Sequence, residues 1–286
     1  MISSRGTARS AVVLLAVAAL AGCTGAGAGT ETPDGPPSPT SSAVAALTDP
    51  DSLRATGTAV VSGDVTLTAW PSVGVVVGPP DEDGAVALTV PLPQIEDATA
   101  SVLPVATLVP PPGATLEVLG DDSALVRGDD GGVLAALGVP VLGGDAVGAG
   151  LDLQVAARDD GTLSWSVVRP VLTDGTVDAD PSPAGTVTAV VAASALRSAT
   201  WADRDDEGGL SLAVVPAAWA RTGGLAAEEA LWAQLVAQVP EAGTTGVRDQ
   251  LTCHTIGAPD KESWNLEPWR PDVGLLATLA ARCNPE

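Results

Sequence analysis

The stretch LDLQVAARDDGTLSWSVV, residues 151–168, decides the fold class of most of this chain. Every second side chain is apolar on either side of a polar centre, ARDDGT. The apolar residues are Leu151, Leu153, Val155, Leu163, Trp165 and Val167. A period of two indicates strands with one buried face, and the Asp-Gly between them indicates a turn. The stretch therefore predicts an antiparallel β-hairpin.

The same texture extends over the region from about 55 to 195. Short runs rich in Val, Leu and Thr are separated there by Asp-Gly and Pro, and no long helical periodicity appears. The candidate strands lie at 65–69 and within GAVALTVPLP (84–93), ATLEVLG (114–120), ALVRGDDGGVLAAL (124–137) and GTVTAVVAAS (185–194). Residues 43–196 are therefore predicted to form a mainly β domain, an antiparallel sandwich or barrel-like fold.

Composition limits both the core and the partners. Hydrophobic residues make up 45% of the 286 residues, and the chain has no Phe and no Tyr, so its core must rely on Val, Leu, Ala and a few Trp. The formal net charge of −22 repels nucleic acid, which is not expected as a partner. With one histidine and no zinc, phosphate-loop or nucleophile-elbow motif, the sequence predicts no metal site and no cofactor.

The N-terminus has the pattern of an export signal. Arg5 and Arg9 precede an apolar run at 11–20 that is shorter than an ordinary transmembrane helix. The following Leu20-Ala21-Gly22-Cys23 resembles the lipobox of bacterial lipoproteins, in which the cysteine thiol receives a diacylglycerol. The sequence thus predicts a signal peptide at residues 1–22 and lipidation of Cys23. A plain secretory signal with an incidental cysteine is the alternative.

Lipidation would anchor the chain on the extracytoplasmic face of the membrane. Residues 23–42 are dominated by Gly, Pro, Ser and Thr, which is typical of a flexible tether. The membrane, reached through lipid on Cys23, is then the first predicted partner.

Residues 197–286 predict a small α+β domain. SATWADRDDEGGLSLAVVP (198–216) has the pattern of two strands around an acidic turn, and GLAAEEALWAQLVAQV (224–239) has helical spacing. A strand is expected near Leu251–Cys253, and a last helix after Pro271. The side chains expected to point inward from that helix are Val273, Leu276, Ala280 and Cys283.

Two cysteines remain beside Cys23. In an exported protein they are expected to pair, and a Cys253–Cys283 bond would close a loop of about 30 residues. The alternative is two free thiols, or a thiolate nucleophile beside His254.

The chemically versatile side chains gather between 253 and 271. This stretch holds the only histidine, the only lysine and two of the seven tryptophans. One interpretation is structural, because an irregular segment around two prolines needs side-chain partners for its backbone, and Arg270 would contact a carboxylate and a Trp. The other is a groove for a sugar or carboxylate ligand. Its candidate residues are His254, Trp264, Glu267, Trp269 and Arg270.

The C-terminal motifs also carry a resemblance. The runs TWADRDDEGGLSLAVVPAAWAR, LWAQLV, RDQLTCH and SWNLEPWRPDVG, with the final Cys-Asn-Pro, resemble a domain of unknown function found in secreted proteins and lipoproteins of actinobacteria. The resemblance covers about residues 197–286. It implies an exported small domain with paired cysteines, and it brings no catalytic residues.

Three functions are compatible with these features. The first is a non-enzymatic surface lipoprotein that binds or scaffolds cell-wall glycan or an envelope protein. The second is a hydrolase of wall glycan or peptide, with Glu267 or an Asp as the acid/base and His254 assisting. The third is calcium-dependent adhesion through the acidic turn at 203–207, whose spacing does not match a calcium loop. The absence of a catalytic signature favours the first.

Overall fold

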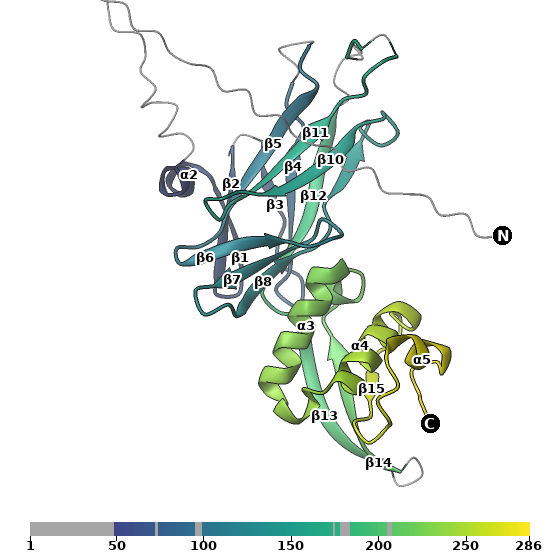
Figure 1. Ribbon diagram of the computed structural model, residues 1–286. Coiled ribbons are helices and arrows are strands. Elements are labelled where there is room, and N and C mark those ends of the chain that lie inside the picture. The colour runs from purple at the N-terminus through teal and green to yellow at the C-terminus, as the bar shows by residue number, and fades with distance from the viewer. Residues whose placement is uncertain (1–48, 72–73, 95–98, 174, 178–183, 205–207) are drawn as a thin grey trace, which may run out of the picture. The chain divides into compact units, whose positions relative to one another are not determined.

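The computed structural model describes residues 49–71, 74–94, 99–173, 175–177, 184–204 and 208–286 (Figure 1). The predicted signal peptide at 1–22, the lipidation site Cys23 and the tether at 23–42 lie outside these residues. Within the described part of the chain, no helix is long and apolar enough to cross a membrane.

Two antiparallel sheets form the N-terminal region. A short helix, α2 (Pro50–Thr56), leads into it. The first sheet has the order β1 (Thr58–Ser62), β2 (Val65–Trp70), β5 (Val102–Val109), β11 (Leu163–Val168), β10 (Asp152–Ala157). The second has the order β3 (Val76–Val77), β4 (Val86–Pro91), β12 (Gly185–Ala192), β8 (Val133–Leu137), β7 (Ala124–Gly128), β6 (Ala114–Val118), and β9 (Val141–Gly144) also pairs with β12.

The hairpin predicted from residues 151–168 is confirmed. Strands β10 and β11 pair antiparallel, with Val155 opposite Trp165. Gly161 in the turn has φ +79°, a conformation that glycine adopts without strain. Along β11, buried and half-buried side chains alternate, so the period of two in the sequence matches the buried face. The other strands predicted in this region are also present.

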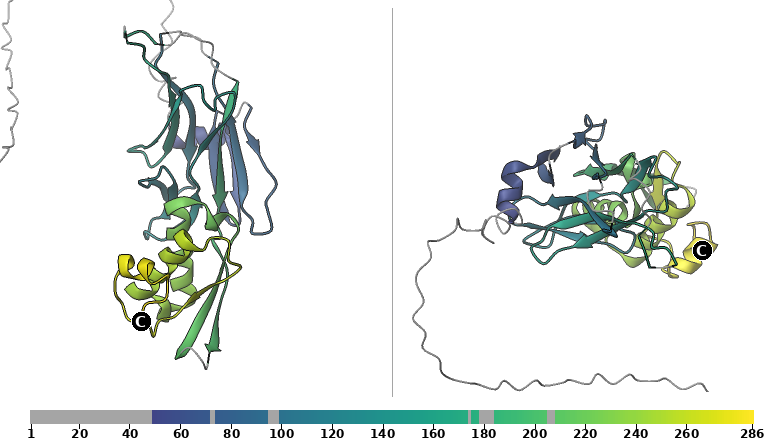
Figure 2. Two further views of the ribbon diagram at one scale, coloured as in Figure 1. Left: turned by 90° about the vertical axis from the view of Figure 1, so that its right-hand side faces the viewer. Right: turned by 90° about the horizontal axis from the view of Figure 1, so that it is seen from above.

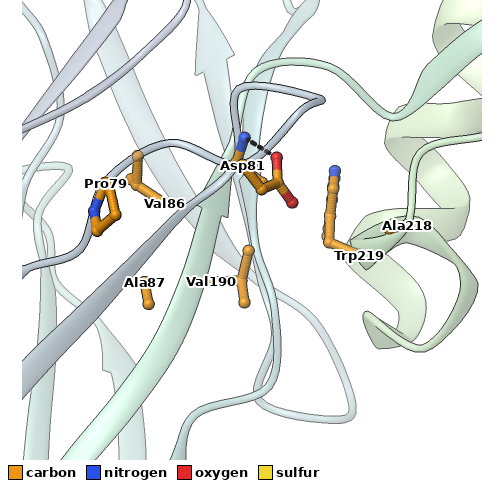
Figure 3. Close-up of a pocket in the computed structure, with 8 residues that line it drawn as sticks. Pro79, Asp81, Val86, Ala87, Val190, Ala218 and Trp219 are labelled. Atoms are coloured by element: carbon orange, nitrogen blue, oxygen red, sulfur yellow. Dashed lines mark hydrogen bonds between the residues drawn. The ribbon is translucent and has the colours of Figure 1, made fainter.

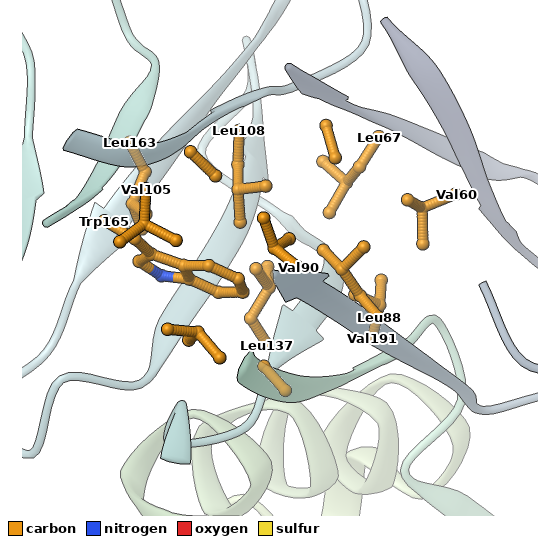
Figure 4. Packing of buried hydrophobic residues seen from close by; sticks show 14 of the residues in the cluster. Val60, Leu67, Leu88, Val90, Val105, Leu108, Leu137, Leu163, Trp165 and Val191 are labelled. Atoms are coloured by element: carbon orange, nitrogen blue, oxygen red, sulfur yellow. The ribbon is translucent and has the colours of Figure 1, made fainter. Parts of the chain in front are cut away.

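One core lies between the two sheets, which makes this region a sandwich (Figures 2 and 4). Leu67, Leu108 and Trp165 come from the first sheet, whereas Leu88 and Leu137 come from the second. Among the described residues of this buried cluster, Trp165 is the one aromatic side chain. Small branched side chains therefore fill the core, as the composition predicts.

The C-terminal region is α+β, as predicted. It contains a three-stranded antiparallel sheet of order β13 (Leu196–Arg204), β14 (Gly209–Pro216), β15 (Trp264–Leu266). Its helices are η1 (Trp219–Arg221), α3 (Gly224–Gln238), η2 (Pro240–Ala242), α4 (Thr245–Gly257) and α5 (Leu275–Ala280). Buried side chains of α3 and α4 pack with those of β14 and β15 in a second core. That core also includes Leu125, Ala136 and Ala192 of the sandwich.

Two sequence predictions for this region are wrong. Leu251–Cys253 lies in α4 and not in a strand, because Gln250 and His254 occupy the buried face of that helix and hide its periodicity. The strand lies instead at β15, inside the segment predicted to be irregular.

The predicted inward face of the last helix is wrong at Val273, Leu276 and Ala280, although Cys283 is buried as predicted. Helix α5 begins at Leu275, and the side chains of Val273 and Leu276 are 42% and 83% exposed. Thr278 is the buried residue of α5. Cys283 is buried too, but it lies beyond the helix with φ +70°, so the helical period does not extend to it.

Candidate functional site

The site predicted from the sequence lies where α4 packs on β15. Strand β15 pairs with β14 only through Trp264–Leu266, and Pro268 follows closely with no N–H to donate. At Glu267, the side-chain amide of Gln250 replaces a neighbouring strand as the hydrogen-bond partner of the backbone. Its Nε2 donates to the Glu267 carbonyl at 3.0 Å, and its Oε1 accepts from the Glu267 N–H at 2.7 Å. A buried side-chain amide thus replaces a strand neighbour.

His254 lies one turn along α4 from Gln250. Its Nε2 is 3.2 Å from the carbonyl oxygen of Asn265, which can only accept, so Nε2 carries a proton and donates it to this carbonyl. The ring stacks on Trp264 with 6.1 Å between centroids and 8° between planes. Burial lowers the pKa of His254, the hydrogen bond to Asn265 opposes this, and nearby Lys261 lowers it further. Nδ1 has no hydrogen-bond partner among the described residues.

Trp264 anchors the connection between α4 and β15. Its side chain is fully buried, and Nε1 donates to the Ala258 carbonyl at 3.0 Å. The guanidinium of Arg221 lies 5.7 Å from the centroid of the Trp264 ring. Arg221 also donates to the carbonyls of Pro259 at 3.0 Å, of Glu262 at 2.8 Å, and of Lys261. One arginine therefore satisfies much of a loop that has no strand partner.

Glu267, Trp269 and Arg270 form a compact group after β15. Arg270 is paired with the carboxylate of Glu267, and their side chains are 12% and 4% exposed. Its guanidinium also donates to the Pro285 carbonyl at 3.2 Å and lies 4.5 Å from the Trp269 ring centroid. The Trp269 ring packs so closely on Gly209 that a Cβ there would meet Cδ1 at 2.5 Å. These are the carboxylate and Trp contacts that the structural interpretation predicts for Arg270.

The predicted disulfide is confirmed. Cys253 and Cys283 are bonded, with an S–S distance of 2.07 Å and a sequence separation of 30. The alternative of free thiols, or of a thiolate nucleophile, is not what the structure contains. The bond joins α4 to the segment after α5.

The five candidate ligand residues are close in the fold but differ in access. His254, Trp264 and Glu267 are 6%, 0% and 3% exposed, whereas Trp269 is 40% exposed. Most of their polar atoms already bond to backbone or to each other. The arrangement is chemically suited to holding α4, β15 and the C-terminus together. A groove lined by all five would need three of them to leave the interior.

A second location, not singled out in the sequence, is a pocket of about 350 Å³ between the sandwich and the C-terminal region (Figure 3). Its lining residues are Pro79, Asp81, Ala85, Val86, Ala87, Val190, Ala218 and Trp219. They come from segments far apart in the sequence, so no local pattern marks the pocket. The DEDG turn at 81–84 is the one signal that draws attention to it.

Ion pairing fixes the two walls of this pocket. Arg197 at the start of β13 forms a two-pronged pair with Asp83, including Nη2 to Oδ2 at 2.8 Å. The same carboxylate accepts from the Ala218 N–H at 2.8 Å. The hydrogen bond from Arg197 is the main cause that lowers the pKa of Asp83. The side chain of Asp83 is 5% exposed, so this contact is a firm link between the two regions.

An acidic site for calcium is not assembled in the described structure. Among those residues, no group of three or more His, Cys, Asp or Glu side chains is arranged to hold a metal ion. Asp205, Asp206 and Glu207 of the acidic turn lie outside the described part of the chain.

Comparison with known proteins finds a family match for the C-terminal region, and that family has no described function. Residues 196–286 match the family described as "Protein of unknown function (DUF2599)". Uncharacterized proteins of Mycobacterium bovis and Mycobacterium tuberculosis are each 48% identical over 83 residues, which is 26% of this chain and 56% of theirs. An uncharacterized protein of Mycobacterium leprae is 37% identical over 65 residues, 21% of this chain and 53% of its own.

The chain therefore spans about half the length of the curated relatives it matches. No solved structure matches it. The resemblance predicted for the C-terminal region, to a domain of unknown function, is confirmed, and the relatives carry no described activity.

Proposed function

We propose that this protein is a non-enzymatic, lipid-anchored binding or scaffolding protein of the cell envelope. It is held on the extracytoplasmic face of the membrane through Cys23, and its folded regions engage cell-wall glycan or another envelope protein. The observation that carries the proposal is Leu20-Ala21-Gly22-Cys23, placed directly after two arginines and an apolar run.

The C-terminal geometry supports a binding role over a catalytic one. The carboxylate of Glu267 is buried against Arg270, and the buried His254 ring is committed to a backbone carbonyl. A general acid or base must reach the substrate's proton, and these two groups face the interior. A disulfide-bonded module suits an oxidising compartment.

Lipid attachment is tested by producing the full chain in an actinobacterial host fed with an alkyne-tagged fatty acid. The wild-type chain is expected to take up the label and to fractionate with membranes, because acyl chains supply the anchor. Cys23→Ser is expected to lose both properties, whereas the matched neighbour Thr24→Ser keeps them. Label that persists in Cys23→Ser, or a wild-type chain that never takes it up, contradicts the proposal.

A further inference from the structure

The pocket between the sandwich and the C-terminal region has two kinds of wall. Small apolar side chains of the sandwich form one side, and Ala218 and Trp219 form the other. Its volume of about 350 Å³ lies at the lower end of the range for small-molecule sites. Among the described lining residues, Asp81 is the one with an ionisable side chain. The pocket therefore suits a slender apolar group that carries one polar end.

Asp81 is held in place before any ligand arrives. Its Oδ1 accepts from the N–H groups of Asp83 and Ala85, both at 2.9 Å. Figure 3 shows the carboxylate turned to the side of the pocket where Trp219 lies. Because Oδ1 is fixed by the turn, the carboxylate would bind a cation without first losing side-chain freedom.

Trp219 is equally constrained. Its Nε1 donates to the Ser194 carbonyl at 2.6 Å. The six-membered part of its ring lies so close to Gly223 that a Cβ there would meet Cε3 at 2.8 Å. The ring is 7% exposed, so it supplies a rigid apolar wall with its polar atom turned to the backbone.

The charge around the pocket favours a cation. Asp81, Glu82 and Asp83 are consecutive. Asp83 is paired with Arg197, which also lies 3.6 Å from Glu82, and Arg221 acts on Asp83 as well, so three carboxylates face two guanidinium groups. A chain with a net charge of −22 adds to this field. Anions are repelled from this opening.

We propose that this pocket binds the side-chain ammonium of a lysine-like residue in an envelope peptide, with the ammonium at Asp81 and the methylene stem along the apolar walls. An amino sugar carries the same cation, but its hydroxyl groups would meet walls that offer them few partners. The inference rests on the proposed binding role and names its ligand class. It does not depend on lipid attachment at Cys23.

The test is a titration of the purified full chain with three probes, followed by saturation-transfer NMR and calorimetry. The probes are Nα-acetyl-lysine N-methylamide, its neutral isostere Nα-acetyl-norleucine N-methylamide, and glucosamine. Saturable binding is expected for the lysine probe alone. Asp81→Asn keeps Oδ1 as an acceptor for the turn and removes the charge, and it is expected to weaken binding by about tenfold or more.

Two further variants make the outcome decisive. Ala218→Leu is expected to abolish binding by filling the pocket, and it replaces Asp81→Asn should that variant not fold. Asp130→Asn is the matched control, because Asp130 supports a turn in the same way, through Gly132 N–H to Oδ1 at 2.9 Å, in an exposed loop.

Failure of the inference has distinct signatures. Equal binding of the norleucine probe rules out a site for the cation, and equal binding of glucosamine rules out a lysine-like ligand. No saturation by the lysine probe, or an equal loss in Asp130→Asn, overturns the site altogether. Each of these results leaves the labelling test of Cys23 unaffected, and loss of labelling leaves the pocket unaffected.

Discussion

The sandwich and the C-terminal region bury different chemistry. The buried polar residues described in the sandwich are four hydroxyl side chains and Arg169, and its core cluster consists of Val, Leu, Ala and one Trp. The C-terminal region buries a glutamine, a histidine and a glutamate, and it adds a disulfide. Strands β13 and β14 pair over eight positions, but β15 has only three residues, so the backbone around β15 lacks the long ladders that satisfy the sandwich.

This difference explains why the rare residue types gather near the C-terminus. Where sandwich strands pair over six residues, the backbone satisfies itself and small apolar side chains suffice. Around β15 the backbone needs Gln250, Arg221 and His254 as partners. The same side chains that invite a catalytic interpretation are therefore used to hold an irregular segment in place.

The largest effect is expected from breaking the buried pair of Glu267 and Arg270. Arg270→Met leaves the Glu267 carboxylate buried without its cation, which should lower the free energy of unfolding by about 3–5 kcal/mol in urea titrations. Arg127→Met in the sandwich is the matched control. Its pair with Glu117 is 32% and 46% exposed, so the loss should be about 0–1 kcal/mol.

Replacing both partners sharpens this prediction. Glu267→Leu with Arg270→Met should recover much of the lost stability, because no unpaired charge stays buried. Equal losses in Arg270→Met and Arg127→Met would show that burial does not separate the two regions.

The disulfide comes next. Cys253→Ser with Cys283→Ser releases a loop with a sequence separation of 30, and the chain-entropy estimate is a loss of about 3–4 kcal/mol in unfolding free energy. Adding reductant to the wild-type chain should lower its urea midpoint to the same value. The double variant should not respond to reductant. A wild-type midpoint that is insensitive to reductant contradicts the prediction.

A smaller effect is expected where the sandwich caps helix α3. Gly223 at the N-cap has no side chain to offer, and the Leu225 N–H donates instead to Asp121 Oδ2 at 2.7 Å. Asp121→Ala should therefore lower the unfolding free energy by about 1 kcal/mol. Asp130→Ala, in the exposed turn of the sandwich, should cost less than about 0.5 kcal/mol. Equal losses of unfolding free energy in Asp121→Ala and Asp130→Ala would mean that the hydrogen bond from Leu225 to Asp121 does not stabilise the contact between the two regions.

The cap should also depend on pH. Burial alone would raise the pKa of Asp121, but hydrogen bonds from Ser123 and Leu225 outweigh it and lower the pKa. Its stabilisation is therefore present above the ordinary carboxyl value near 3.8 and is lost as the pH falls through the lowered value. Asp121→Ala should lack this part of the acid sensitivity.

Sequence reasoning succeeded where side-chain period and burial agree. Strands β4 and β11 of the sandwich alternate, and the structure buries the predicted side of β11. It failed at α4, since that helix buries Gln250 and His254 and so shows no apolar period. It failed at α5 because the helix spans only Leu275–Ala280, so Val273 and Cys283 lie outside it, and the backbone turns left-handed at Arg282 and Cys283. The pocket at Asp81 and Trp219 could not be predicted from the sequence, because its lining residues come from distant segments that meet only in the folded chain.

The most direct test of the account is an NMR titration of His254, the only histidine of the chain. Burial lowers its pKa in the folded state, so the unfolded chain takes up the proton at higher pH. Stability is therefore complete above the ordinary value near 6.5 and falls as the pH drops below it towards the lowered value. His254→Gln should remove this dependence.

We expect the imidazole of the folded full chain to reach half-protonation below the ordinary value near 6.5, and its signals not to move when wall fragments are added. A titration midpoint at or above pH 6.5, together with shifts on adding wall fragments, would mean that His254 belongs to an open site. That result would contradict the claim that the rare residues of the C-terminal region serve its packing.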